Sequence, residues 1–516
     1  MRRQASFSFF DSDGFHVFVQ GKIKTYTTRD GLSSLDINSV YEDQQRTFWI
    51  ETKDKGLNRL KDGAFTVYAI QDGEPRDLPN DETRITAVCE DSKGNVWIAR
   101  RGQGLSRWRS LSGENFTAAE HFSSDDIKTD IETIYEDREG NIWLGTLNNG
   151  LSRVTDHVFK IYSSGEGLAD TNIYPMLEDR AGNVWVGTWE GDLYKLSGGA
   201  FTHYGKAQGL SFQAIGSLYE DAGGVLWIGT FGGDVNRFDN GKFIHLTAKD
   251  GLPDDNIRAI TEDAAGNLWF GTTNGLAKYK DGKFTVYNTA DGLPDKEVQA
   301  LTIDRAGNLW IGTLGGIARF KDDKFTAYTE REGLSSNYVR VIHEDRDGVI
   351  WIGTYDGGLT RIKDNRLTRI AMREGLYDNG AFQILEDDGD NFWMSCNRGV
   401  YRVSRSELNE VADGRRRFVS SVHYGKADGL LNTECNGGTQ PAGFKARDGK
   451  LWFPTQNGVA VVDPREIRSS ELPPPVAIEE FILNNEPVVF RKDAQIPVSV
   501  ESFEIHYTGL SFVRPE

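Results

Sequence analysis

Adjacent carboxylates recur along the chain and are the residues best suited to chemistry. Two neighbouring carboxylates could serve as a general acid and base, or could contribute oxygen ligands to a calcium ion. Each pair stands at the same point of a recurring phrase, whereas catalysis needs one asymmetric constellation. We therefore predict that the aspartate caps the D-x-x-G-N turn that follows it and that the pairs are not catalytic. The pairs are Glu136-Asp137, Glu178-Asp179, Glu220-Asp221, Glu262-Asp263, Glu344-Asp345 and Glu386-Asp387.

The other residue types with catalytic or metal-binding potential form no pattern. The eight histidines are scattered, without H-E-x-x-H or any other paired spacing. The three cysteines, Cys89, Cys396 and Cys435, form neither a disulfide framework nor a zinc motif. No G-x-S-x-G, Walker or kinase signature occurs. We predict no catalytic residue, no metal and no cofactor in this chain.

A tryptophan marks each copy of the phrase E-D-x-x-G-N-x-W-I-G-T-x-x-G-G-L-x-R. The central copies are 42 residues apart, as from Trp185 to Trp227 and from Trp227 to Trp269. A fixed period of this length indicates a repeat architecture, and β-propeller blades are the main candidate. The tryptophans are Trp49, Trp97, Trp143, Trp185, Trp227, Trp269, Trp310, Trp351, Trp393 and Trp452.

Each repeat contains four short strand patterns. Residues 257–289 read IRAIT, LWFGT, LAKYK and KFTVYNT, separated by turns rich in Asp, Asn and Gly. In L-W-I-G-T the side chains alternate between two apolar faces, as a sheet packed between two neighbours requires. The glycine leaves room for a bulky neighbour to approach. The predicted fold class is all-β, with tandem β-propellers of four-stranded antiparallel blades.

Composition and charge exclude several classes of protein. The chain has 516 residues, too many for one ordinary core, and 57 glycines, as a turn-rich all-β protein requires. The net charge of −18 argues against nucleic acid as a partner. No apolar run is long enough to span a bilayer, and the N-terminus MRRQASFSFF shows no signal-peptide pattern. The last repeat spacing is lengthened by residues 402–417, where we expect a short helical turn.

The motif D-x-x-G-N-[LIV]-W-[IVLF]-G-T-x-x-G-[GD]-[LIV] with its linking D/E-G-L covers about residues 14–465. It resembles the repeat of the two-component regulator propeller family. The stretch 424–464 resembles the family's terminal blade, and residues 473–488 with 503–512 resemble the beginning of the three-Tyr (Y_Y_Y) β-sandwich that follows it.

The resemblance implies a function as well as a fold. Its members are ligand-binding sensor regions of bacterial membrane signalling proteins, such as two-component sensor histidine kinases. It implies a periplasmic location, a small-molecule or oligosaccharide ligand, and a homodimer formed through the full-length protein. Membrane attachment would come only from a downstream segment, and kinase activity would not reside in these residues.

The repeat and the resemblance together predict three regions. Residues 1–166 form an incomplete N-terminal propeller of a half-blade and three blades, residues 167–467 a seven-bladed propeller, and residues 474–516 a truncated Y_Y_Y β-sandwich. Both ends fall inside a structural unit, so we expect a fragment of a longer protein. The last copy lacks a fourth strand, and ring closure by N-terminal strands is the alternative explanation.

Positions that vary within the constant frame are the best candidates for ligand binding. The residue after G-T lies in a turn near the predicted central channel, on the same face of the disk as the D-G-L loops. Aromatic rings exposed there could stack on sugar rings, or could instead pack on neighbouring loops. The predicted ligand-binding residues are Trp189, Phe231, Tyr355 and Asn397 after G-T, with Phe212 and Tyr377 from the D-G-L loops, where Tyr338 is a further aromatic.

The first copies of the repeat break the frame. Glu51 stands where other copies have glycine, and Arg100-Arg101 follow Ala99. The two arginines could hold an anion bidentately, but we favour ion pairs with nearby carboxylates.

Two other functions are compatible with the repeats. A stand-alone propeller for protein interaction would carry the same blades without an output module. A propeller enzyme of the streptogramin-lyase type would need a unique histidine base with a metal-binding carboxylate, and no such group stands out in the sequence.

Overall fold

The computed structural model describes residues 7–19, 22–43, 46–53, 56–68, 85–102, 104–110, 116–122, 130–138, 140–154, 157–211, 213–232, 234–239, 241–254, 256–467, 476–484, 486–488 and 502–509. They form 45 strands, eight 3₁₀ turns and one α-helix, α1 (Arg405–Ala412), which confirms the all-β prediction. The helix lies where a helical turn was expected. The chain divides into two compact units, His157–Ile467 and Met1–Asp156 with Arg468–Glu516.

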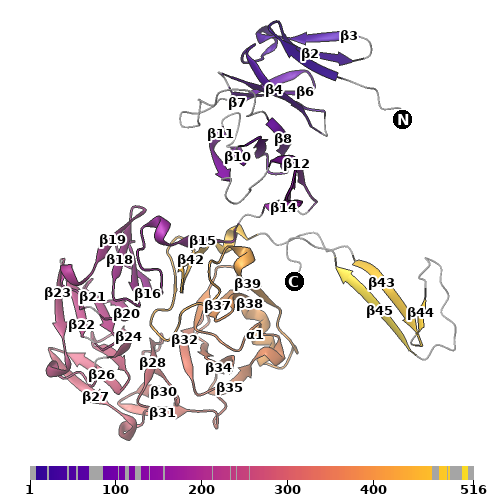
Figure 1. The fold of residues 1–516 in the computed structure, drawn as a ribbon. Coiled ribbons are helices and arrows are strands. Elements are labelled where there is room, and N and C mark those ends of the chain that lie inside the picture. The colour runs from indigo at the N-terminus through magenta and orange to yellow at the C-terminus, as the bar shows by residue number, and fades with distance from the viewer. Residues whose placement is uncertain are drawn as a thin grey trace. The chain divides into compact units, whose positions relative to one another are not determined.

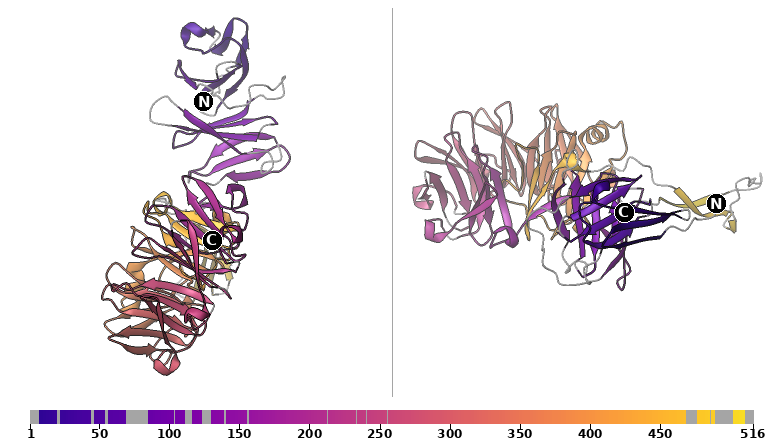
Figure 2. Two further views of the ribbon diagram at one scale, coloured as in Figure 1. Left: turned by 90° about the vertical axis from the view of Figure 1, so that its left-hand side faces the viewer. Right: turned by 90° about the horizontal axis from the view of Figure 1, so that it is seen from above.

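The unit His157–Ile467 is a ring of seven four-stranded antiparallel sheets (Figure 1). The first strand of each blade contacts that of the next, and β16 also contacts β40, so the series of blades closes on itself. Figure 2 shows the same ring in two turned views.

The blades follow one another in chain order. The first three contain β16 (Ile173–Glu178), β17 (Val184–Thr188), β18 (Leu193–Ser197), β19 (Ala200–Tyr204); β20 (Ile215–Glu220), β21 (Leu226–Thr230), β22 (Val235–Asp239), β23 (Lys242–Leu246); and β24 (Ile257–Glu262), β25 (Leu268–Thr272), β26 (Gly275–Lys280), β27 (Lys283–Tyr287). The next three contain β28 (Val298–Ile303), β29 (Leu309–Thr313), β30 (Gly316–Lys321), β31 (Lys324–Tyr328); β32 (Val339–Glu344), β33 (Ile350–Thr354), β34 (Leu359–Lys363), β35 (Arg366–Ile370); and β36 (Gln383–Glu386), β37 (Asn391–Cys396), β38 (Gly399–Ser404), β39 (Ser421–Tyr424). The seventh contains β40 (Phe444–Lys445), β41 (Leu451–Thr455), β42 (Gly458–Val462) and β15 (Phe159–Tyr162).

The seventh blade takes its outermost strand from the beginning of the ring. β15 pairs antiparallel with β42, with Phe159 opposite Val462 and Tyr162 opposite Val459. The ring therefore begins at His157, before the boundary expected at residue 167. The strand missing from the last repeat is β15, which directly precedes the first blade of the ring, and not one of the strands at the N-terminus of the chain that the ring-closure alternative invoked. Pairing both ends of the ring in one sheet holds it closed by backbone hydrogen bonds.

One aspartate organises the first turn in six of the seven blades of the ring. Asp263 accepts the backbone N–H groups of Ala265 and Asn267, both at 3.0 Å, and the Asn267 side-chain amide at 2.9 and 2.7 Å. The Trp269 indole N–H also donates to Asp263, at 2.9 Å. The predicted turn cap is confirmed, and the same carboxylate satisfies a buried indole. The Trp–Asp bond recurs at Trp185–Asp179, Trp227–Asp221, Trp310–Asp304, Trp351–Asp345 and Trp393–Asp387.

The glutamate before that aspartate joins neighbouring blades. Glu220 accepts the backbone N–H of Arg180 at 2.8 Å, from the first turn of the preceding blade. The same contact closes the ring, because Glu178 accepts the backbone N–H of Arg447 at 2.9 Å. Both carboxylates of the Glu-Asp pairs therefore have a structural role as acceptors of backbone N–H groups. Equivalent bonds join Glu262 to Ala222, Glu344 to Arg305 and Glu386 to Arg346.

The glycine of L-W-I-G-T lies where two blades approach closely. A Cβ at Gly229 would overlap Ser217 Oγ and would lie 2.6 Å from Ile257 of the next blade. At Gly271 a Cβ would lie 2.6 Å from Val298, again in the next blade. A larger side chain would push the blades apart. The glycine therefore leaves room for a bulky neighbour, as the sequence predicted.

The N-terminal unit contains four sheets between residues 7 and 154. The first has three strands rather than the two of the predicted half-blade, because residues 7–11 also pair with the sheet. The prediction that these sheets belong to an incomplete propeller stays a prediction. The sheets are β1 (Phe7–Asp11), β2 (Gly14–Val19), β3 (Lys22–Tyr26); β4 (Ile37–Glu42), β5 (Phe48–Thr52), β6 (Gly56–Lys61), β7 (Ala64–Tyr68); β8 (Ile85–Glu90), β9 (Val96–Arg100), β10 (Gly104–Ser110), β11 (Phe116–Phe122); and β12 (Ile131–Glu136), β13 (Ile142–Thr146), β14 (Leu151–Val154).

The residues that break the frame in this unit contact one another. Arg100 Nε lies 3.0 Å from Glu51 Oε1, and both side chains are largely buried. Glu51 also accepts a hydrogen bond from Ser39 Oγ at 3.0 Å. Arg101 Nε lies 3.4 Å from Asp130 Oδ2. The prediction that both arginines form ion pairs is confirmed.

A three-stranded antiparallel sheet is described near the C-terminus. β43 (Val476–Leu483) pairs with β44 (Glu486–Val488) and β45 (Phe503–Gly509). These strands fall in the region predicted as the start of a Y_Y_Y β-sandwich. Residues 474–475, 485, 489–501 and 510–516 lie outside the described part of the chain, so the sandwich stays a prediction.

Candidate functional site

A segment of the seventh blade occupies part of the ring's central channel. Residues 435–442 (the channel segment) precede the two-residue strand β40 and lie against the first strands of other blades (Figure 1). The Met176 N–H donates to the Pro441 carbonyl and the Leu218 N–H to the Gln440 carbonyl, both at 3.0 Å. The Gln440 side chain also bonds to the Leu301 N–H at 2.9 Å and to its carbonyl at 2.6 Å. The channel segment is therefore fixed to strands from three different blades.

A variable position on the first strands faces the channel segment. Arg258 Nη1 donates to the Gly438 carbonyl at 3.3 Å. A Cβ at Gly438 would overlap Arg340 Nη1 and would lie 3.8 Å from Gln299 Oε1. Sequence reasoning missed this position, although its variation within a constant frame was the signal that could have revealed it. Its occupants, each following the first apolar residue of the strand pattern, are Tyr174, Gly216, Arg258, Gln299, Arg340 and Phe382.

Two predicted ligand-binding residues form an aromatic group at one side of the channel. The Trp189 ring centroid lies 5.0 Å from that of Tyr174 and 5.8 Å from that of Phe231. Phe231 lies over Gly216, where a Cβ would come within 3.0 Å of its ring. The Arg258 guanidinium lies 5.1 Å from the Phe231 centroid. Trp189 is 45% exposed, so its indole is open to solvent.

A second aromatic group surrounds Arg340. The Tyr355 ring stacks on Tyr338 and on Phe382, with centroid distances of 5.0 and 5.8 Å. The Arg340 guanidinium lies between 4.5 and 5.7 Å from the centroids of all three rings, and its Nη2–H donates to the Tyr338 hydroxyl at 2.9 Å. Tyr355 is 41% exposed. The predicted residue Tyr355 thus lies beside a cation held by aromatic faces.

The remaining predicted residues belong to other places on the ring. Tyr377 stacks on His423 at 4.5 Å between centroids, and the Arg398 guanidinium lies 4.5 Å from the Tyr377 ring. Asn397 is exposed in the turn after β37. Phe212 lies outside the described residues. A ligand-binding role for any of the predicted residues stays a prediction.

We define the channel mouth as the two aromatic groups and the arginines between them. Burial lowers the pKa of Arg340, and the positive charge of Arg258 lowers it further, against the opposing effect of Tyr338. Burial also raises the pKa of Tyr174, with Glu434 adding to this effect and Arg340 opposing it. The channel mouth consists of Tyr174, Trp189, Phe231, Arg258, Tyr338, Arg340, Tyr355 and Phe382.

Polar atoms beneath the mouth lack hydrogen-bond partners among the described residues. They are Arg258 Nε, Gln299 Oε1, Arg340 Nε and Thr439 Oγ1, all of them buried. Buried polar atoms normally have partners, because an unsatisfied donor or acceptor loses its hydration without compensation. A group of such atoms around Gly438 therefore marks a place suited to a small polar ligand or to water.

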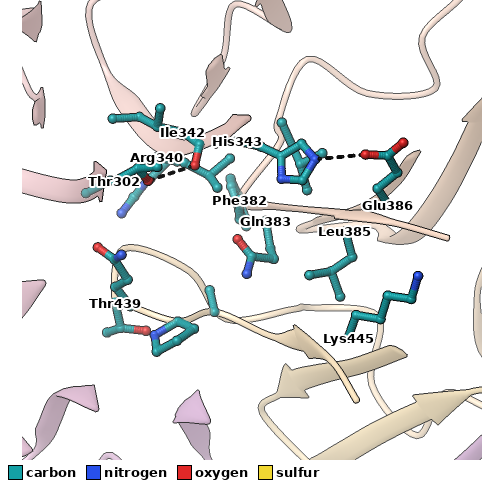
Figure 3. A pocket seen from close by; sticks show the side chains of 16 residues that line it. Thr302, Arg340, Ile342, His343, Phe382, Gln383, Leu385, Glu386, Thr439 and Lys445 are labelled. Atoms are coloured by element: carbon teal, nitrogen blue, oxygen red, sulfur yellow. Dashed lines mark hydrogen bonds and ion pairs between the residues drawn. The ribbon is translucent and has the colours of Figure 1, made fainter. Parts of the chain in front are cut away.

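A cavity of about 300 Å³ lies next to the channel segment. The strands β28, β32 and β36 bound it on one side and residues 439–442 on the other (Figure 3). Arg340 and Phe382 of the channel mouth contribute to its wall, as do His343 and Glu386 farther along the strands. The cavity therefore extends the channel mouth into the ring, at the lower end of the size range of ligand pockets.

The glutamate in this cavity has a structural role. Burial acts to raise the pKa of Glu386, but His343 and Arg346 lower it to about 2. His343 Nε2 lies 3.6 Å from Glu386 Oε2, beyond hydrogen-bond distance. Glu386 accepts the Arg346 backbone N–H, which is one of the hydrogen bonds between blades. We therefore assign Glu386 the role of joining neighbouring blades. Within the described part of the chain, no cluster of three or more His, Cys, Asp or Glu could hold a metal ion.

Seven segments of the chain match the family model described as two component regulator propeller. They are residues 79–99, 127–148, 167–190, 209–232, 251–274, 292–315 and 333–356. The chain carries two-component regulator propeller repeats. The matched segments in the ring extend just past the G-T turn, so the regulator propeller repeat itself places Trp189, Phe231 and Tyr355 at its end.

Solved structures support the propeller fold. The extracellular domain assigned to the hybrid two component system BT3049 from B. thetaiotaomicron has 21% identity and a TM-score of 0.67, covering 95% of this chain and 64% of that structure. The chain therefore spans less than two thirds of the length of that relative. The extracellular domain assigned to the hybrid two component system BT4673 from the same organism has 18% identity and a TM-score of 0.50, with coverages of 95% and 73%.

A propeller enzyme is also similar, at a lower level. Virginiamycin B lyase from Staphylococcus aureus has 17% identity and a TM-score of 0.47, covering 59% of this chain and 98% of the lyase. No curated protein matches the sequence. Within the described residues, no helix has both the length and the hydropathy of a membrane span.

Proposed function

We propose that this chain is the extracytoplasmic, ligand-binding sensor region of a bacterial two-component signalling protein. Its regulator propeller repeats support this function, as does the likeness of its fold to extracellular domains assigned to hybrid two component systems. The observation that carries the proposal is the channel mouth. The blade frame is constant, whereas aromatic and cationic residues at the mouth differ from blade to blade, as binding of an asymmetric ligand requires.

The chemistry of the channel mouth fits a sugar ring better than a purely apolar ligand. Trp189 and Tyr355 present aromatic faces that are 45% and 41% exposed. Tyr355 lies beside Arg340, and Trp189 packs on Phe231, which lies beside Arg258. Aromatic faces bind the C–H surfaces of sugars at little cost in conformational entropy, while polar neighbours bind the hydroxyl groups. We therefore favour an oligosaccharide over other small molecules.

Signalling requires that the ligand favour one conformation over another. A ligand at the mouth would contact the channel segment, which is bonded to strands of three blades. It could thereby shift the packing of blades in the ring. In the full-length protein, a homodimer and a downstream membrane segment would carry this change to a histidine kinase or similar output module.

Thermal unfolding of the whole chain with a panel of neutral and acidic mono- and oligosaccharides tests the proposal. We expect one saccharide class to raise the melting temperature, since a ligand at 100 times its Kd stabilises the folded state by about 2.7 kcal/mol. Trp189→Ala and Tyr355→Ala should lose this increase while unfolding at nearly the same temperature without ligand. Ile244→Ala is the matched control, because Ile244 is 48% exposed on the outer strand β23.

Two outcomes would contradict the proposal. One is a panel in which no saccharide stabilises the folded wild-type chain. The other is stabilisation that persists unchanged in both the Trp189 and Tyr355 variants, which would place the ligand elsewhere.

A further inference from the structure

Arg258 and Arg340 approach the same residue of the channel segment, Gly438, and neither has an acidic partner among the described residues. Arg361 forms an ion pair with Asp413 and is largely buried. Arg405 lies within ion-pair distance of four carboxylates, those of Asp345, Asp347, Glu386 and Asp390. Among the described residues, by contrast, the recorded partners of Arg258 and Arg340 are aromatic rings, a hydroxyl and a backbone carbonyl, all of them neutral.

This arrangement carries an energetic cost. Two guanidinium groups that lose water without gaining an anion are disfavoured, and their mutual repulsion adds to that cost. The cation–π contacts recover only part of it. The chain has a net charge of −18, so acidic residues are abundant, yet neither of these two arginines pairs with one among the described residues.

The geometry leaves donors available for an anion. Both arginines contact Gly438, from different blades, and the Nε of each is buried without a partner in the described chain. Guanidinium Nε–H and Nη–H groups bind carboxylate or sulfate oxygens in a bidentate manner. Gln299 Oε1 and Thr439 Oγ1, which are also unsatisfied, supply acceptors for neighbouring hydroxyl groups.

We propose that Arg258 and Arg340 form an anion-binding site at the channel mouth, and that the ligand is an acidic saccharide. Its carboxylate or sulfate would lie between the guanidinium groups, and its sugar rings would stack on Trp189 and Tyr355. This inference rests on the proposed function for the saccharide part, whereas the anion site follows from the arginine pair itself. Without the anion, the two positive charges repel each other; with it, each becomes part of an ion pair.

Calorimetric titration of the whole chain with a matched pair of ligands tests the charge requirement. The pair is a galacturonate trisaccharide and its methyl ester, which has nearly the same shape but no charge. We expect the acid to bind at least tenfold more tightly than the ester, and its affinity to fall as NaCl is raised, because salt screens the ion pairs. Galactose 6-sulfate, in a parallel titration, distinguishes a preference for sulfate from a preference for carboxylate.

Arginine variants locate the site. Arg258→Gln and Arg340→Gln should each weaken binding of the acidic ligand by roughly tenfold to a hundredfold, the range for loss of a hydrogen bond to a charged group. Both variants should retain the wild-type far-ultraviolet circular dichroism spectrum and should not unfold at lower temperature, because each removes an uncompensated charge. Arg398→Gln is the control, since Arg398 lies beside Tyr377 and is 3.8 Å from Asp378.

The outcomes separate the two proposals. Equal binding of acid and ester, lost in Trp189→Ala but unchanged in Arg340→Gln, would overturn the anion site and keep the sensor function. Binding of inorganic sulfate that needs both arginines, with no saccharide binding, would keep the anion site and overturn the saccharide sensor. Binding of neither sulfate nor any acidic saccharide to a folded wild-type chain would overturn both.

Discussion

The closed ring and the N-terminal unit use the same strand pattern but bury it to different extents. Leu193, at the start of β18 in the ring, is fully buried and packs with Leu210, Ile215 and Leu218 of the following blade. Leu151 holds the same position in β14 of the N-terminal unit and is 67% exposed. A repeat thus supplies a blade that is apolar on both faces, but burial depends on the neighbouring blade.

The two regions also differ in how blades are brought together. In the ring, Gly229 lets Ile257 of the next blade approach to a distance that no larger side chain permits. In the N-terminal unit, Glu51 holds the place of that glycine in one blade, Arg100 holds the place of the following threonine in the next blade, and the two form an ion pair. The ring therefore relies on close apolar packing, whereas these blades rely on a charge contact that needs both partners.

The largest expected effect is a difference in stability between the alanine variants of the two leucines. Leu193→Ala should destabilise the ring by about 2–5 kcal/mol, because it leaves a cavity between two blades. Leu151→Ala should cost less than about 0.5 kcal/mol, as is usual for exposed positions. Hydrogen exchange followed by mass spectrometry measures the opening free energy of each unit separately. Equal losses in the two variants would refute the comparison.

A second prediction concerns the ion pair of the N-terminal unit. Glu51→Gln should destabilise that unit by about 3 kcal/mol, because the largely buried Arg100 loses its partner. The double variant Glu51→Gly with Arg100→Thr restores the ring's residue types at these two positions and should recover most of that loss. Urea unfolding of the three proteins checks the order, and a double variant less stable than the single one would show that these blades cannot pack as the ring does.

A third and smaller effect should appear in acid. The pKa of Asp263 is lowered from 3.8: burial acts to raise it, but the hydrogen bonds from Asn267 and Trp269 outweigh that effect. The pKa of Asp179 is lowered in the same way. A lowered pKa in the folded state means that these carboxylates stabilise the ring above about pH 4 and lose that contribution as the pH falls through the folded-state pKa.

The corresponding measurement is the urea midpoint of the ring between pH 6 and pH 3. We expect the wild-type urea midpoint to decrease as the pH is lowered. The Asp263→Asn variant, whose side chain cannot ionise, should have a lower midpoint at pH 6 and a smaller decrease toward pH 3. An identical pH dependence in the variant would show that this turn does not contribute to acid sensitivity.

The repeating contacts were accessible from the sequence because they are local. The D-x-x-G-N turn places the Asp263 carboxylate within reach of Asn267 and Trp269, and six of the seven ring blades repeat the spacing from aspartate to tryptophan. The alternation in L-W-I-G-T likewise predicts which residues face a neighbour. Even the ion pair between Arg100 and Glu51 was foreseeable in kind, since a charge that breaks an apolar frame needs a partner.

The candidate site was only partly predictable. Variation after the G-T turn led to Trp189, Phe231 and Tyr355, and the structure places each of them in an aromatic group at the channel mouth. Arg258 and Arg340 vary at an equally constant position of the first strand, but a residue inside a strand gives no sign of facing a channel. Only the contacts with Gly438, 98 or more residues later in the chain, bring the two arginines to one place.

The sequence by itself determined the blade, its four strands, its turn cap and the period that makes a propeller, because these depend on hydrogen bonds and alternation within about 42 residues. The tertiary structure decided how the ring closes and what lies in its channel. β15 and β42 pair although almost the whole sequence of the ring separates them. The channel segment does not follow the repeat pattern at all. Such contacts join residues far apart in the chain, where no local propensity or period specifies the partner.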